Sequence, residues 1–143
     1  MPEGSPKRTE VEDRIIKARL KGPSFCQICD AELKWITDQI MFRTAALVGC
    51  GLPQTEEFAD IISTELIVLI NDFGYSEITF EEILLALRLN AKGGLKYPSG
   101  LDIERVGFSG TVFNVDFISR ILSNYMAIRN SLDSKLRNHI DGY

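Results

Sequence analysis

Two helical segments in the middle of the chain constrain the fold more than any other feature of the sequence. The first runs from Thr55 to Gly74 and the second from Thr79 to Gly94. Each begins with a threonine, carries acidic residues in its first turn and stops at glycine, as helix termini prefer. Apolar residues recur in both segments at intervals of three and four, which is the period of a helix. The sequence therefore predicts a mainly α-helical core.

Three further helices are predicted around this pair. The first covers 10–21, begins at a Thr9-Glu-Val-Glu capping box and stops at a Gly-Pro pair. Another covers roughly 26–48, although Asp30 would also serve as its N-cap, and it ends at a glycine- and proline-containing turn. The last runs from Asn114 or Asp116 toward Asn138. These elements predict about five helices in a bundle-like domain.

The expected packing follows from the width of each apolar face. Apolar residues nearly encircle the segment 56–73 toward its C-terminal end, so we expect it to be the central helix, packed against the second, fourth and fifth helices. Trp35 is counted among the apolar positions of the second helix. The last helix has one continuous apolar face, expected to pack within the chain rather than in a dimer, and its members are Ile118, Ile121, Tyr125, Ile128 and Leu132.

The segment 92–112 is rich in glycine and has no helical period. Its length is unusual for a connection in a small domain. Residues 102–107 and 111–115 could form two short strands, which would place a small β-hairpin in the 101–115 loop. Residues 1–8 are polar and contain two prolines, which is typical of a disordered tail. We therefore expect an all-α fold, with a single helical domain over 9–143.

Charge is distributed unevenly along the chain. The formal net charge is -4, but 55–90 contain one arginine and eight acidic residues. Such an acidic core argues against a broad nucleic-acid surface, which is normally basic. Basic residues gather instead on the first helix and in the glycine-rich loop. The candidate contacts for an acidic partner or for phosphates are Arg14, Lys17, Arg19, Lys21, Lys96 and Arg105.

No pattern in the sequence predicts catalysis, a cofactor or a metal. Cys26 and Cys29 have the spacing of a metal or redox motif, but a zinc site needs four ligands. The remaining candidates, Cys50 and the single His139, lie at wide separations. A histidine near a chain end is also a poor general base. Glu81 and Glu82 are assigned to helix capping and to the surface.

The chain is expected to be cytoplasmic. Its N-terminal residues lack the charged-then-apolar pattern of a signal peptide. The most apolar run, 66–70, is too short to span a bilayer, so no membrane association is predicted.

The order of predicted helices and loop over 64–132 resembles that of a family of uncharacterised bacterial proteins encoded by phages and other mobile elements. One shared element is Ile78-Thr79-Phe-Glu-Glu82-Ile-Leu-Leu-Ala86, and the other is Asn124-Tyr125-Met-Ala-Ile-Arg129. That family is loosely similar to the helicase-loader and replication-organiser proteins of phages. The resemblance implies a non-enzymatic adaptor in the replication of a mobile element.

Two functions are consistent with the sequence. The preferred one is a non-enzymatic interaction module with a protein partner. The alternative is a DNA-binding regulator that uses the basic first helix or the 92–112 loop as a wing, although DNA binding is expected to be weak. An enzyme ranks third, because no acid–base constellation is present. The sequence leaves the oligomeric state open.

Overall fold

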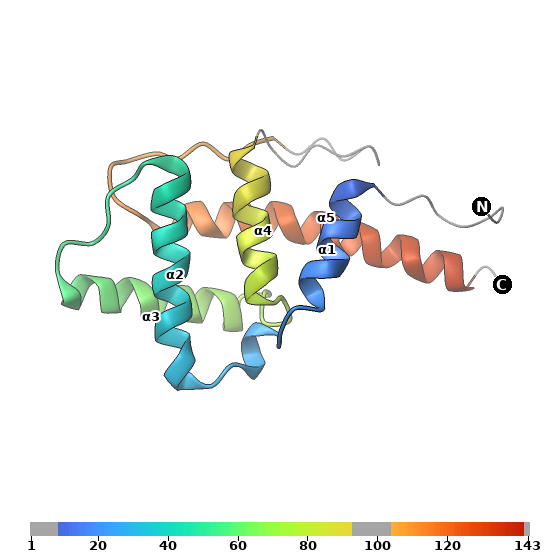
Figure 1. Ribbon diagram of the computed structural model, residues 1–143, viewed down its shortest axis with the longest axis horizontal. Helices are drawn as coiled ribbons and strands as arrows, with labels where there is room; N and C mark the ends of the chain where they lie inside the picture. The colour runs from blue at the N-terminus through green and yellow to red at the C-terminus, as the bar shows by residue number, and fades with distance from the viewer. Residues whose placement is uncertain (1–8, 93–103, 142–143) are drawn as a thin grey trace.

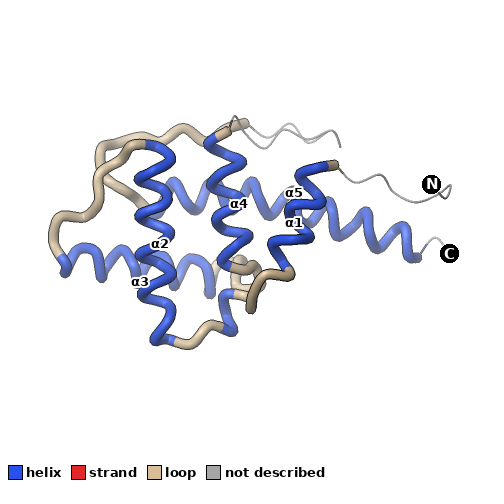
Figure 2. Tube along the Cα trace, in the orientation of Figure 1, coloured by secondary structure: helices blue, strands red, loops and turns tan. Residues whose placement is uncertain are grey.

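The computed structural model describes residues 9–92 and 104–141, with side chains up to residue 138, and contains five α-helices and one short 3-10 helix. In chain order these are α1 (Glu10–Arg19), η1 (Phe25–Gln27), α2 (Asp30–Val48), α3 (Glu56–Asp72), α4 (Phe80–Ala91) and α5 (Val115–Asp141). The described residues form no β-strand, and their only extended pairings are two isolated bridges (Figure 2). The prediction of an all-α fold is confirmed.

The helices form two layers. α2, α4 and α1 lie side by side in one layer, and α3 and α5 cross behind them (Figure 1). α4 lies in the middle and packs against α1, α2 and α5. The prediction that the third helix is central is therefore wrong. α3 leaves Phe58 and Ile61 exposed near its N-terminus, whereas α4 buries residues on several sides, namely Glu82, Ile83, Leu84, Ala86, Leu87 and Asn90.

Local capping signals explain where most helices begin. The Thr9 and Thr79 side chains each accept a hydrogen bond from the backbone N–H of a glutamate three residues later, and both glutamates close the capping box. Thr55 caps α3 by accepting from the N–H of Phe58 at 3.1 Å. Because these bonds lie within four consecutive residues, sequence alone predicts them well.

The structure favours the later of the two starts that the sequence allows for the predicted helix 26–48. The chain first forms η1, and α2 begins only at Asp30. The backbone N–H of Phe25 donates to Ile78 O at 2.8 Å, and that of Cys26 donates to Ser76 O at 3.0 Å. These bonds attach η1 to the turn before α4, so the same residues cannot continue into α2.

The apolar face of α5 is fully internal. All five predicted members, including Tyr125 and Ile128, are at most 1% exposed, and they face the other helices of the same chain. The prediction of intrachain packing is confirmed. Trp35 behaves differently from the prediction: it lies on α2 with 58% of its surface exposed.

The segment before α5 is held by side chains rather than by strand pairing. The buried Asn90 side chain donates to Val106 O at 3.0 Å and accepts from Val106 N at 2.8 Å. Farther along, Phe113 N donates to Gly51 O at 2.9 Å. The predicted hairpin is therefore wrong for 104–115, because Val106 and Phe113 bond to other elements and not to each other. Residues 101–103 lie outside the described residues.

Candidate functional site

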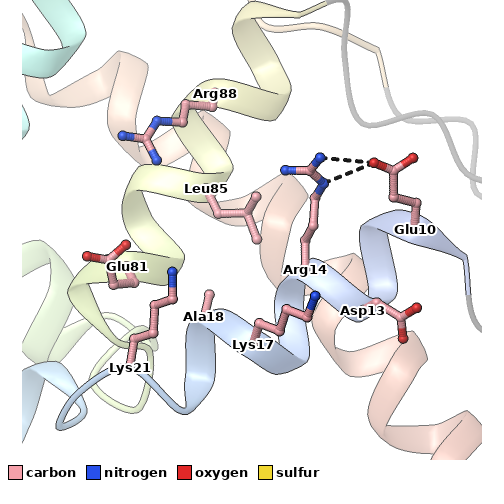
Figure 3. A pocket seen from close by; sticks show the side chains of 9 residues that line it. All are labelled: Glu10, Asp13, Arg14, Lys17, Ala18, Lys21, Glu81, Leu85 and Arg88. Carbon is pink, nitrogen blue, oxygen red and sulfur yellow. Dashed lines mark hydrogen bonds and ion pairs between the residues drawn. The ribbon is translucent and has the colours of Figure 1, made fainter.

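A groove between α1 and α4 gathers three of the six basic residues singled out in the sequence. The two helices are joined at one end by the Thr79 hydroxyl, which donates to Ala18 O at 2.9 Å. The groove has a volume of about 410 Å³. It is lined by Glu10, Asp13, Arg14, Lys17, Ala18, Lys21, Glu81, Leu85 and Arg88 (Figure 3).

The cations of the groove differ in how they are paired. Arg14 Nη2 lies 2.9 Å from Glu10 Oε1, one helical turn away. The hydrogen bond from Arg14, followed by its positive charge, lowers the pKa of Glu10. Lys17, Lys21 and Arg88 form none of the side-chain hydrogen bonds or ion pairs found within 9–92 and 104–138. Their charges are therefore available to a ligand.

The shape of the groove adds an apolar floor to these charges. The side chains of Lys17, Lys21 and Arg88 lie around Leu85 and Ala18 (Figure 3). Leu85 is half-buried and Ala18 is buried. An acidic ligand with some apolar surface would satisfy both features, because its carboxylates could pair with the cations while its carbon atoms cover the floor.

The structure separates the six predicted contact residues. Arg14, Lys17 and Lys21 line the groove. Arg19 points away from it: its Nη1 donates to Asp133 Oδ1 of α5 at 2.8 Å, and its Nε lies 4.0 Å from Glu82 Oε2. Arg105 is exposed in the segment before α5 and does not line the groove. Lys96 lies outside the described residues.

Sequence reasoning missed Arg88, the fourth cation of the groove. It is the only basic residue between 55 and 90, within the most acidic part of the chain, and so it did not stand out. The helical spacing of the residues around it could nevertheless have placed Arg88 on the face of α4 that lines the groove. Glu81, Leu85 and Arg88 are spaced four and three residues apart, which puts them on one face of α4.

A buried polar cluster links α4 to α5 and α1. The fully buried carboxylate of Glu82 accepts from Tyr125 OH at 2.6 Å and from Arg129 Nε at 2.8 Å, both through Oε2. Its Oε1 accepts from Thr79 N at 3.2 Å. The prediction of a capping role for Glu82 is confirmed, whereas its assignment to the surface is wrong. Only the tertiary fold brings Tyr125 and Arg129 to this carboxylate.

This cluster has the chemistry of a structural site. Glu82 and Tyr125 both have 0% of their surface exposed, and three donors occupy the carboxylate. Burial, followed by the negative charge of Glu82, raises the pKa of Tyr125 well above its usual range. The phenol therefore keeps its proton and serves as a fixed hydrogen-bond donor. A buried carboxylate with its lone pairs engaged is poorly placed to act as a general base on a substrate.

The cysteines show no metal-site geometry. Cys26 and Cys29 are exposed, Cys50 is half-buried, and all three are free thiols. Burial raises the pKa of the Cys50 thiol. Within the described part of the chain, no three residues of the His, Cys, Asp or Glu types are grouped as metal ligands. The side chain of His139 lies outside that part.

Comparisons with known proteins give no indication of function, so the groove and the buried polar cluster are the main guides to it. No protein-family model, curated protein or solved structure matches this chain. Across the described residues, every helix is too short or too polar to cross a membrane.

Proposed function

We propose that this protein is a non-enzymatic adaptor that binds an acidic segment of a partner protein in the α1–α4 groove. One observation carries the proposal: Lys17, Lys21 and Arg88 surround an apolar floor and have no ion-pair partner among the described residues. Grooves with an apolar floor and charged edges are typical sites for short helical or extended segments of other proteins.

The composition of the groove favours a protein segment over a nucleic-acid backbone. Glu10, Asp13 and Glu81 line the same groove as the cations. A continuous row of phosphates would meet these carboxylates, whereas a protein segment can place its acidic residues only beside the cations. The alternative function is a DNA-binding regulator that uses the basic α1 or the 92–112 loop, and phosphates bound along α1 would meet this repulsion.

The setting of this adaptor rests on sequence resemblance alone. Residues 64–132 resemble proteins encoded by phages, prophages and other mobile elements, and we propose that the partner belongs to the DNA-replication machinery of such an element. An adaptor of this kind would act in the cytoplasm.

The proposal is tested by measuring the binding of two labelled probes by fluorescence anisotropy near physiological salt. One probe is a synthetic peptide containing glutamate and leucine, and the other is a short DNA duplex. We expect the peptide to bind and the duplex to bind much more weakly. Lys17→Glu/Lys21→Glu should weaken peptide binding by about tenfold or more, because two favourable charge pairs become repulsive.

A matched control variant distinguishes the loss of charge in the groove from a change in the net charge of the protein. Arg43→Glu/Arg105→Glu changes the net charge by the same amount at two exposed residues that do not line the groove. This variant should bind the peptide like the wild type. Tight duplex binding, lost in either double variant, would contradict the adaptor proposal and favour the DNA-binding alternative.

A further inference from the structure

A second hollow adjoins the groove at the N-terminal end of α4. Its volume is about 200 Å³. Its apolar part is formed by Trp35 and Ile36 of α2 with Phe80 of α4 and Ile28. The rings of Trp35 and Phe80 meet edge to face, with their centroids 6.1 Å apart and their planes at 60°.

The exposure of Trp35 makes this hollow unusual for the molecule. Trp35 is 58% exposed although it is the only tryptophan in the chain, and Phe80 is half-buried beside it. Tryptophan is enriched at binding sites, where its large apolar area is buried only in the complex. An apolar cavity of about 150 Å³ can hold benzene. The hollow therefore has room for one large apolar side chain.

The hollow and the groove are neighbours on the surface. Lys21 and Glu81 line both of them. Along α4, the surface passes from Phe80 at the apolar end, past Leu85, to Arg88 at the basic end. Arg88 lies eight positions after Phe80, which corresponds to about 12 Å along a helix.

We infer that the two hollows form one composite site for a protein segment with a large apolar anchor followed by acidic residues. This inference rests on the proposed function and adds a requirement for the anchor. The anchor packs against Trp35 and Phe80, and the acidic residues pair with Lys17, Lys21 and Arg88. On a helical ligand, the carboxylates that reach Arg88 lie about two turns from the anchor.

The geometry decides which chemistry such a ligand must have. The charged end of the site excludes a wholly apolar segment, because the three cations would lose water without gaining a partner. The apolar end adds little to a purely acidic chain. Only a segment that combines both features uses the whole site.

Trp35 supplies the probe for the test, because its fluorescence is the only tryptophan signal of the protein. Three synthetic peptides are titrated against the full chain: one with a leucine anchor and glutamates, one with the leucine replaced by alanine, and one with the glutamates replaced by glutamine. The first should bind tightest and shift the Trp35 emission to shorter wavelength, as expected when an indole leaves water. Losing the leucine should weaken binding by about fivefold or more, as loss of a buried anchor does.

Two variants on α2 locate the anchor. Trp35→Ala should weaken binding of the leucine peptide to a similar extent in an anisotropy measurement. Phe42→Ala removes another exposed aromatic residue of α2 that does not line the hollow, and it should leave binding unchanged.

The possible results separate this inference from the proposed function. If the alanine peptide binds as tightly as the leucine peptide and the Trp35 emission does not move, the composite site is wrong and the acidic-segment proposal stands. If neither glutamate peptide binds, the proposed function fails, and the composite site fails with it. If the glutamine peptide binds as well as the first, the acidic residues are not needed, and both the acidic-segment proposal and the composite site are wrong.

Discussion

Glu82 shows how a single buried charge can organise three helices. Its carboxylate is fully buried and accepts hydrogen bonds from Thr79 N, Tyr125 OH and Arg129 Nε. Arg19 lies close by and also pairs with Asp133. A buried charge of this kind is tolerated because its donors replace the water that it has lost.

We predict that Glu82→Gln destabilises the fold by about 3 kcal/mol, because the largely buried Arg129 loses its anion. Urea unfolding followed by circular dichroism measures the change. The control is Glu81→Gln, the neighbouring carboxylate, for which no hydrogen bond or ion pair is found among the described residues. This variant should stay within about 0.5 kcal/mol of the wild type. Equal effects of the two substitutions would mean that the cluster adds nothing to stability.

We predict that the buried Tyr125 makes the free energy of unfolding depend on pH in the alkaline range. Burial and the charge of Glu82 raise the pKa of its phenol above the ordinary value of 10.0. The folded chain therefore keeps a proton that the unfolded chain releases, so this contribution to stability is complete below about pH 10 and declines above it. Phenolate absorbance should show that one of the four tyrosines ionises only when the chain unfolds.

The variant Tyr125→Phe assigns this titration. It should remove the phenolate signal that appears only on unfolding, and it should reduce the loss of stability at high pH. If the wild type instead ionises all four tyrosines while circular dichroism still reports a folded chain, the description of the buried phenol is wrong.

At the scale of elements, one asparagine fixes the segment that leads into α5. Asn90 is 2% exposed, and its amide forms both a donor and an acceptor bond with the backbone of Val106. These two bonds take the place of a strand partner for a segment that has no regular structure of its own.

We predict that Asn90→Ala releases this segment, because the N–H and C=O of Val106 lose their partner. Hydrogen exchange at the Val106 amide should become faster, with little change at Tyr125. The control Asn130→Ala alters an exposed asparagine of α5 and should leave the exchange at Val106 unchanged. Unchanged exchange in Asn90→Ala would show that other contacts hold the segment.

The elements also show which parts of the fold are readable from sequence. Helix starts were predicted well, because each cap is a contact within four residues, as at Thr9 and Thr79. The choice of central helix was wrong, because the apolar width of α3 and α4 is similar in sequence and only packing decides which helix is covered. The sequence left the start of α2 open between Cys26 and Asp30 for the same reason: the bonds that keep Phe25 and Cys26 out of the helix come from Ser76 and Ile78, about fifty residues away.

The candidate site was predictable to a similar degree. The basic run on α1 was visible, and three of its members line the groove, namely Arg14, Lys17 and Lys21. The inward direction of Arg19 was not visible, because its partners Asp133 and Glu82 lie on other helices. The contribution of Arg88 likewise depends on α4 lying beside α1.

At the scale of the whole molecule, the two-layer arrangement separates the contacts that hold the fold together from the proposed binding groove. The buried cluster and the apolar face of α5 hold the layers together. The groove lies instead between two neighbours of the same layer, α1 and α4, where side chains can reach solvent (Figure 3). Changes at Lys17, Lys21 or Arg88 should therefore affect binding and leave unfolding within about 0.5 kcal/mol of the wild type. Thermal unfolding of the charge-reversal variant checks this separation, and a large loss of stability would contradict it.

The central claim is that the α1–α4 groove is the binding surface of this protein. The most direct measurement is chemical-shift mapping of the isotope-labelled chain during titration with the leucine-anchored acidic peptide. We expect the largest changes at the backbone amides of Lys17, Lys21, Leu85 and Arg88, with the amides of Ile61 and Glu65 on α3 unaffected. Changes centred on α3 or on the segment 104–114, with the groove silent, would contradict the claim.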